Sequence, residues 1–137
     1  MAVGFKVHFA WYEVGTEGFL NSFFSTISYH LEPEGWGTKY PYLMNHLYHG
    51  KIENALIPEM MKEILEIRER LQNYSLSQII WDIEDLTKLP PYNVIKAEIT
   101  NLSNYFVTSE GKDLFDMLLS LLGKANKLKL DFEIKSL

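Results

Sequence analysis

The sequence contains no cysteine among its 137 residues. This excludes a disulfide-stabilised scaffold, a metal site built on thiolates and catalysis by a cysteine nucleophile. Basic residues are also in the minority, because 13 Lys and Arg stand against 18 Asp and Glu, a formal net charge of −5. Nucleic-acid binding needs clustered cations to neutralise phosphates, so the composition argues against DNA or RNA as a direct partner.

Long apolar runs are missing as well. No stretch approaches the roughly 20 apolar residues that a membrane-spanning helix needs. The N-terminus shows no basic segment followed by an apolar run and a small-residue cleavage site, so no secretion signal is expected. We therefore expect a cytoplasmic protein without a membrane partner.

Aromatic residues are plentiful: the chain has eight Phe, eight Tyr and three Trp. Most such rings belong in a core, but Tyr and Trp also serve interfaces. Apolar residues make up 47% and charged residues 23% of the chain, which is typical of a globular protein. At this length we expect one domain, residues 1–137, with a single core.

The most distinctive stretch is residues 79–86, Ile-Ile-Trp-Asp-Ile-Glu-Asp-Leu. Apolar and polar residues alternate in it, a period of two that predicts a strand with one apolar face. Three acids, Asp82, Glu84 and Asp85, gather at its C-terminal end, and Pro90 and Pro91 follow. We predict a central strand that anchors a sheet and presents an acidic surface.

Alternation predicts further strands. We expect one long strand over residues 3–11. We also expect a hairpin whose strands are residues 95–99 and 105–108, with the turn at 101–104. Residues 130–135 predict a final edge strand, whose charged face would discourage stray pairing.

Helical periodicity and capping signals predict the remaining elements. The first helix begins after Thr16 and ends before Pro33. A short helix covers residues 42–49 and closes at Gly50, and a longer one covers residues 53–73, with Pro58 at its first turn or separating two pieces. The last helix is expected to start from a cap at Thr108 or Ser109.

This order of elements lacks the regular alternation of parallel α/β folds. We predict an α+β domain with a mixed or mainly antiparallel sheet of about four to five strands flanked by helices. Between the first two helices, a loop at residues 34–41 places Trp36 between two glycines. The ring of Trp36 either folds back as a lid on the core, which is favoured for so large an aromatic, or stands out as a contact residue.

Candidate catalytic groups are weakly supported. Asp82 and Glu84 would lie on one side of a strand and could share a proton or a metal, and the spacing of His46 and His49 suits a metal. No HExxH motif, nucleophile elbow, Walker loop or GxGxxG turn accompanies them. We predict no catalytic residue, no metal and no cofactor. The alternatives are a small metal-dependent hydrolase, or a regulatory or scaffold dimer that self-associates through a sheet edge or aromatic patch.

Several longer strings carry a family resemblance. They are Trp11-Tyr12-Glu13-Val14-Gly15, residues 23–32 (FFSTISYHLE), residues 36–41 (WGTKYP), residues 80–85 (IWDIED), Pro90-Pro91 and residues 101–108 (NLSNYFVT). Together they make the chain resemble the immunity protein 70 family of bacterial polymorphic toxin systems. The resemblance extends over nearly the whole chain.

The resemblance implies a small cytoplasmic protein that binds a cognate toxin C-terminal domain and neutralises it by stoichiometric association. Many such toxins are nucleases with basic clefts, and the acids Asp82, Glu84 and Asp85 would suit such a partner. The rings of Trp36, Tyr40, Tyr42 and Tyr92 would supply aromatic anchors. These seven residues are our predicted partner-binding set; the oligomeric state is not predicted.

Overall fold

The computed structural model describes residues 2–91 and 96–136. Its elements, in chain order, are strands β1 (Ala2–Val7) and β2 (Ala10–Thr16), helix α1 (Glu17–Leu31), a π-helical turn (Tyr42–Leu47), strand β3 (Lys51–Ile52), helix α2 (Ile57–Leu71), helix α3 (Leu114–Leu128) and strand β4 (Phe132–Ser136). Two short 3-10 turns, Asn54–Leu56 and Leu76–Gln78, flank α2. The strands form one sheet in the order β2-β1-β4-β3, with every neighbouring pair antiparallel. The predicted α+β class with an antiparallel sheet of four strands is confirmed.

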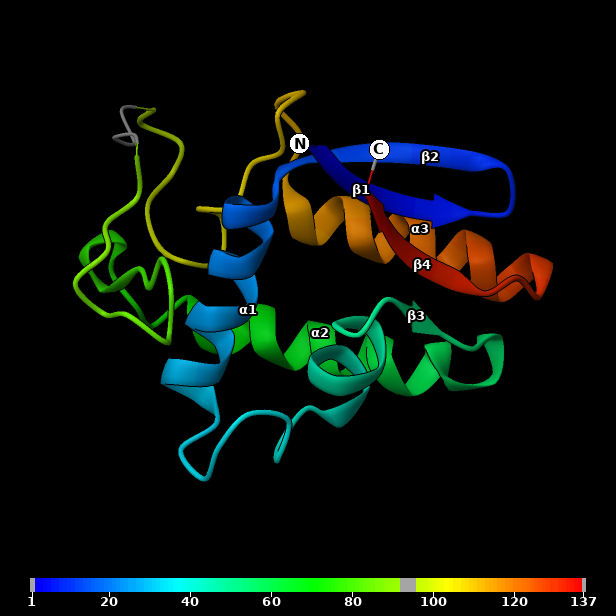
Figure 1. Cartoon of the computed structure of the whole chain (residues 1–137), viewed down its shortest axis with the longest axis horizontal. Coiled ribbons are helices and arrows are strands. Elements are labelled where there is room, and N and C mark those ends of the chain that lie inside the picture. The colour runs from blue at the N-terminus through cyan, green and yellow to red at the C-terminus, as the bar shows by residue number, and fades with distance from the viewer. Residues whose placement is uncertain (1, 92–95, 137) are drawn as a thin grey trace.

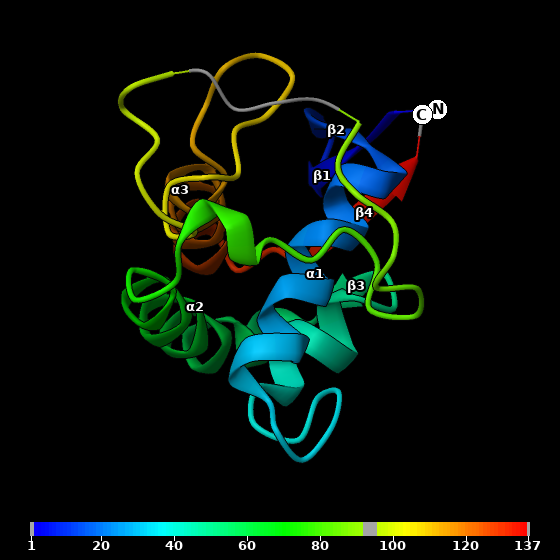
Figure 2. The same cartoon turned by 90° about the vertical axis from the view of Figure 1, so that its left-hand side faces the viewer.

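The helices lie on one side of the sheet and run in two directions. α2 and α3 run alongside each other in opposite directions, and α1 stands at a steep angle to both (Figures 1 and 2). The first and last strands pair, so the two ends of the chain lie together (Figure 1). The core between sheet and helices is rich in rings: Phe23 makes edge contacts with Phe24, Phe106 and Phe115. No helix of the described residues is long and apolar enough to cross a membrane.

The prediction of one long strand over residues 3–11 is wrong, because the chain reverses at His8 and Phe9. Val7 pairs with Ala10, and β1 and β2 form a hairpin. The reversal lets the Trp11 ring cover Gly4, where an added Cβ would lie 2.6 Å from that ring. The alternation holds up to Val7, which is buried, and fails at Phe9, which is 88% exposed.

The helix boundaries are mostly as predicted. The hydroxyl of Thr16 accepts a hydrogen bond from the amide of Phe19 (3.1 Å) and caps α1. Pro58 lies in the first turn of α2. The predicted cap of α3 is wrong, since Asp113 is the cap and accepts from the amide of Asp116 (3.0 Å). Thr108 instead closes a separate tight turn before the helix, with its amide donating to the Lys112 carbonyl.

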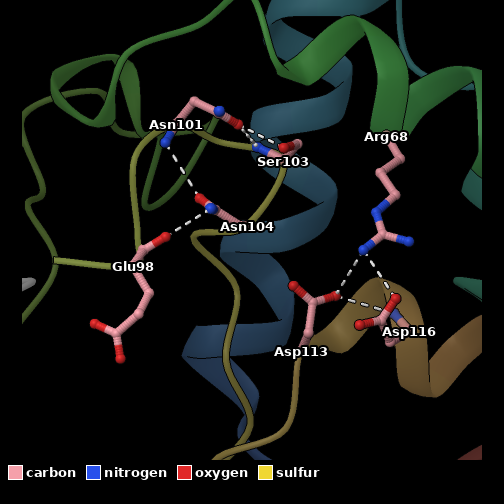
Figure 3. Close-up of polar contacts among 7 residues, drawn as sticks. All are labelled: Arg68, Glu98, Asn101, Ser103, Asn104, Asp113 and Asp116. Atoms are coloured by element: carbon pink, nitrogen blue, oxygen red, sulfur yellow. Dashed lines mark hydrogen bonds and ion pairs between the residues drawn. The ribbon is translucent and has the colours of Figure 1, made fainter. Parts of the chain in front are cut away.

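Two predicted strands are corrected in the C-terminal half. Residues 96–100 are not a strand but part of a turn, held by Asn104, whose side-chain amide donates to the Glu98 carbonyl (Figure 3). The hairpin prediction is therefore wrong for the described residues, and its Ile95 lies outside them. The last strand is also not an edge, because β4 lies between β1 and the two-residue strand β3. A pattern of one charged face cannot tell an edge strand from an inner one.

Arg68 links the antiparallel helices α2 and α3. Arg68 on α2 contacts the carboxylate of Asp116 at 2.8 Å and that of Asp113 at 3.7 Å, both at the start of α3 (Figure 3). Carboxylates at a helix N-terminus are favoured by the helix dipole, and the guanidinium adds a tertiary link.

Candidate partner-binding surface

The predicted central strand at residues 79–86 is wrong: this stretch lies along α1, turns at residues 83–84 and again at 86–87, and joins no sheet. Side-chain hydroxyls of α1 take the place of a neighbouring strand. Ser22 and Thr26 both donate to the Ile80 carbonyl (2.7 and 3.1 Å), and the Ile83 amide donates to Ser25 (3.1 Å). The two-residue period therefore does not mark a strand here, because the segment takes its hydrogen bonds from a helix and turns after Asp82.

The close approach of this segment depends on a glycine of α1. A Cβ added at Gly18 would lie 2.9 Å from the ring of Trp81. Buried backbone groups must find partners, and here buried hydroxyls supply them. The acidic segment is thus fixed to a helix at several points rather than free to move as a surface loop.

The three acids of the segment have different surroundings. Asp82, with a side chain 23% exposed, accepts from the Glu84 amide (2.9 Å) and faces Lys88 at 3.5 Å. Asp85 accepts hydrogen bonds from both the hydroxyl (2.6 Å) and the amide (3.1 Å) of Thr87. Both bonds lower the pKa of the Asp85 carboxyl, and the hydroxyl contributes more than the amide. The Glu84 side chain is exposed.

Trp36 folds back onto the molecule, the arrangement favoured from sequence. Its indole nitrogen donates to the Met44 carbonyl (2.8 Å), and its ring packs 4.8 Å from Tyr48 and 6.5 Å from Phe24 between centroids. The ring remains partly exposed, so it lies over the core and also contributes to the surface.

The loop that carries Trp36 is held by a buried carboxylate. Glu32 is 3% exposed and accepts from the amides of Gly37 (3.0 Å), Lys39 (3.1 Å) and Tyr40 (2.9 Å). Charge-assisted bonds of this kind are about twice as strong as neutral ones. Glu32 therefore fixes the loop conformation that presents Trp36.

Tyr40 lies inside rather than on the surface, since it is 2% exposed. Its hydroxyl donates to Glu66 (2.5 Å) and accepts from Arg70 (2.8 Å), both on α2. Burial, together with the bond to Glu66, raises the pKa of Tyr40 to about 12. In this structure Tyr40 presents no ring to a partner.

The other two predicted tyrosines differ. Tyr42 is half-buried, with its ring 5.5 Å from that of His46 and its amide donating to Glu63 (3.2 Å). Tyr92 lies outside the described residues.

Asp82, Glu84 and Trp36 come together in a hollow beside α1. A depression of about 430 Å³ is lined by these three residues with Ile83, Asn21, Tyr48 and His49. A second depression of about 620 Å³ adjoins it through Asn21, Tyr48 and His49 and continues past Glu17 to Val3 and Ile134. We call the two together the acidic groove.

The acidic groove has a one-sided charge. Among the described residues its lining includes the carboxylates of Glu17, Asp82 and Glu84 and no lysine or arginine. Asp82 is paired with Lys88, which lies outside the lining, so Glu17 and Glu84 carry the unpaired negative charge of the groove. Its walls include the rings of Phe24, Trp36 and Tyr48, which pack against one another. An apolar wall beside carboxylates suits a cationic side chain with an aliphatic stem.

Sequence reasoning did not place Glu17, Asn21, Tyr48 or His49 in this groove. Glu17 and Asn21 lie one turn apart at the start of α1, a spacing that was visible in the sequence. Tyr48 and His49 follow the π-helical turn, and no local pattern predicted which way they point.

The residues weighed as metal ligands do not assemble. No group of three His, Cys, Asp or Glu side chains placed to hold a metal occurs in residues 2–91 and 96–136. His46 and His49 border a shallow hollow together with Lys51, whose positive charge opposes a bound cation.

Comparison with protein families gives a match. The family model described as Immunity protein 70 matches residues 5–134, from β1 to β4. No curated protein and no solved structure matches the chain. Because the match covers nearly the whole length, the chain belongs to the immunity protein 70 family.

Proposed function

We propose that this chain binds the C-terminal toxin domain encoded beside it and neutralises that domain by one-to-one association in the cytoplasm, without catalysis or cofactor. The observation that carries the proposal is the family match over residues 5–134. Members of an immunity family protect the producing cell, and a protein that only occludes its target needs no catalytic residues.

The acidic groove supports this proposal as the docking surface. Glu17 and Glu84 are acids of the lining without an ion-pair partner among the described residues, and a partner with a basic cleft, such as a nuclease, carries the opposite charge. Complementary charge speeds association and fixes register, and partly buried rings supply contact area. Trp36 and Tyr48 are the rings of the groove that we propose as anchors.

A growth experiment tests the neutralisation. The toxin domain encoded next to this chain is expressed in a sensitive host with and without the chain, and a toxin domain from an unrelated system serves as the control. We expect growth to be restored against the neighbouring toxin domain and not against the control. Continued killing by the neighbouring toxin domain, with the chain present in soluble folded form, would refute the proposal.

A charge-reversal experiment tests the groove separately. Glu17 and Glu84 are exposed, so Glu17→Lys with Glu84→Lys reverses the groove without removing the turn contacts of Asp82. The matched control reverses two exposed acids elsewhere, Glu69→Lys with Glu110→Lys. We expect the groove variant to associate at least about tenfold more slowly with the toxin domain at low salt. Equal association rates for the two variants would place the docking surface elsewhere.

A further inference from the structure

Strand β4 has a free edge along its second half. The two-residue strand β3 pairs only with Phe132 and Glu133, so residues 134–136 continue past its end and pair with β1 on their other side (Figure 1). The last backbone contact on the β3 side is the Ile134 amide, which donates to the Gly50 carbonyl (2.8 Å). Beyond that bond, no strand of the described residues lies beside β4 on this side.

The bond to Gly50 identifies the backbone groups that point outward. In an antiparallel pair, successive residues alternate between bonding to the partner strand and facing away from it. The Ile134 amide faces away from β1, so the Ile134 carbonyl and the Ser136 amide, two residues further on, face the same way. Neither group has a hydrogen-bond partner among residues 2–91 and 96–136. Both can therefore pair with one more extended backbone.

The acidic groove begins at this free edge. Ile134 of β4 and Val3 of β1 line the larger of its two depressions, together with Glu17 and Asn21 of α1. The smaller depression adjoins through Asn21 and continues to Glu84. Side chains of a strand point alternately to its two faces, so a backbone paired with β4 would direct every second side chain into the groove.

The charge of the groove restricts what can occupy it. Glu17 and Glu84 form no ion pair among the described residues, whereas Asp82 is paired with Lys88. A cation from the occupant would therefore meet two unpaired carboxylates. A second copy of this chain would bring the same acids to the same groove, and its net charge of −5 opposes that pairing.

We propose that the occupant is an extended, basic segment of the toxin domain, which adds to the sheet as a strand beside β4. This inference rests on the proposed function and specifies how the toxin domain is held. The Ile134 carbonyl and the Ser136 amide would bond to the backbone of the segment, and its lysine or arginine side chains would reach Glu17 and Glu84. Backbone pairing supplies affinity, and the acids select a basic segment.

The backbone contact is tested by removing one amide. Ser136→Pro deletes the outward N–H and places a ring where the added strand would approach, while the described fold loses no hydrogen bond. Ser136→Ala is the matched control, because it removes the same hydroxyl and keeps the amide. We expect Ser136→Pro to bind the purified toxin domain at least about tenfold more weakly than Ser136→Ala. Equal affinities of the two variants, both folded by their melting curves, would overturn the strand pairing.

A second measurement uses the unaltered chain, so it does not depend on a variant that folds. Hydrogen exchange of the Ser136 amide is compared by NMR in the free chain and in its complex with the toxin domain. The amide of Glu110, an exposed residue outside the groove, is the control. We expect exchange at Ser136 to slow at least about tenfold in the complex, and exchange at Glu110 to stay unchanged.

The two proposals fail in different ways. If the complex forms and the Ser136 amide is slowed no more than the Glu110 amide, this inference is overturned and the proposed function stands. If the unaltered chain forms no complex with the toxin domain, both are overturned.

Discussion

The hydroxyl of Thr26 satisfies both backbone groups of Ile80, donating to the carbonyl (3.1 Å) and accepting from the amide (3.2 Å). A neighbouring β-strand would do the same for an extended residue. Here one buried side chain on α1 does it, and this contact fixes the acidic segment against the helix that forms the groove.

Thr26→Val tests that contact, because valine keeps the shape and removes the hydroxyl. The Ile80 amide would lose its partner, and an unsatisfied buried group costs about 1–3 kcal/mol. We expect a loss of unfolding free energy of this size in urea titration. The control is Thr38→Val. Thr38 is exposed, so water can take over the hydrogen bond that its hydroxyl donates to the Gly35 carbonyl. Equal effects of the two substitutions would show that the Thr26 hydroxyl does not hold the segment.

Glu32→Gln tests the support of the Trp36 loop. The amide keeps one acceptor oxygen for three backbone donors, so at least one of the amides of Gly37, Lys39 and Tyr40 loses its charge-assisted bond. We expect a cost of about 1.5–3 kcal/mol and a change in tryptophan fluorescence as Trp36 moves. Glu34→Gln, exposed on the same loop, should cost less than about 0.5 kcal/mol. An unchanged stability of Glu32→Gln would contradict this role.

Glu63 gives the fold a pH dependence. Burial raises the pKa of its carboxyl, although the amides of Leu43 and Tyr42 partly oppose this by bonding to the carboxylate. The native state therefore holds the Glu63 proton more tightly than the unfolded state does, and ionisation as pH rises past 4.5 removes stability.

Glu63→Gln eliminates this contribution. The quantity to compare is the unfolding free energy of the wild type minus that of Glu63→Gln. We expect this difference to fall as pH rises from the pKa of Glu63 in the unfolded state to its higher pKa in the folded state. Glu69→Gln on the exposed side of α2 controls for the charge change. Denaturant titrations at several pH values measure the difference, and a difference that rises with pH would show that the sign is wrong.

His8→Gly and Lys129→Gly test the strained backbone positions. Both residues have φ 57, and Lys129 ends α3 in the left-handed conformation that usually takes glycine. We expect each substitution to raise the unfolding free energy by roughly 0.5–1 kcal/mol, since relief of the strained φ exceeds the entropy cost of glycine. A lower melting temperature for His8→Gly would mean that the hairpin turn is not strained at this residue.

Local signals predicted much of the fold. The Thr16 cap, the position of Pro58 and the spacing of buried residues in α1 and α2 depend on neighbours in sequence, and these predictions match the structure. The segment at 79–86 was misassigned because its hydrogen bonds come from α1, more than 50 residues away. A signal did exist, since four hydroxyl residues, Ser22, Ser25, Thr26 and Ser28, are buried in one apolar helix.

The surface was less predictable than the fold. Asp82, Glu84 and Trp36 line one groove. The sequence had grouped these three residues only by their charge and their aromatic rings. Tyr40 differs, because its hydroxyl binds Glu66 and Arg70 from a helix later in the chain, and no local pattern indicates that burial. Tyr48 and His49 enter the groove through the path of the chain after the π-helical turn, which the sequence did not reveal.

The most direct test of the account is a titration of the active toxin domain with the purified chain. Occlusion by one-to-one binding predicts that residual toxin activity falls in proportion to the chain added and reaches its minimum at an equimolar ratio. Loss of toxin activity at a small fraction of that ratio would mean that each copy of the chain inactivates many toxin molecules, and it would contradict a protein that acts by binding alone.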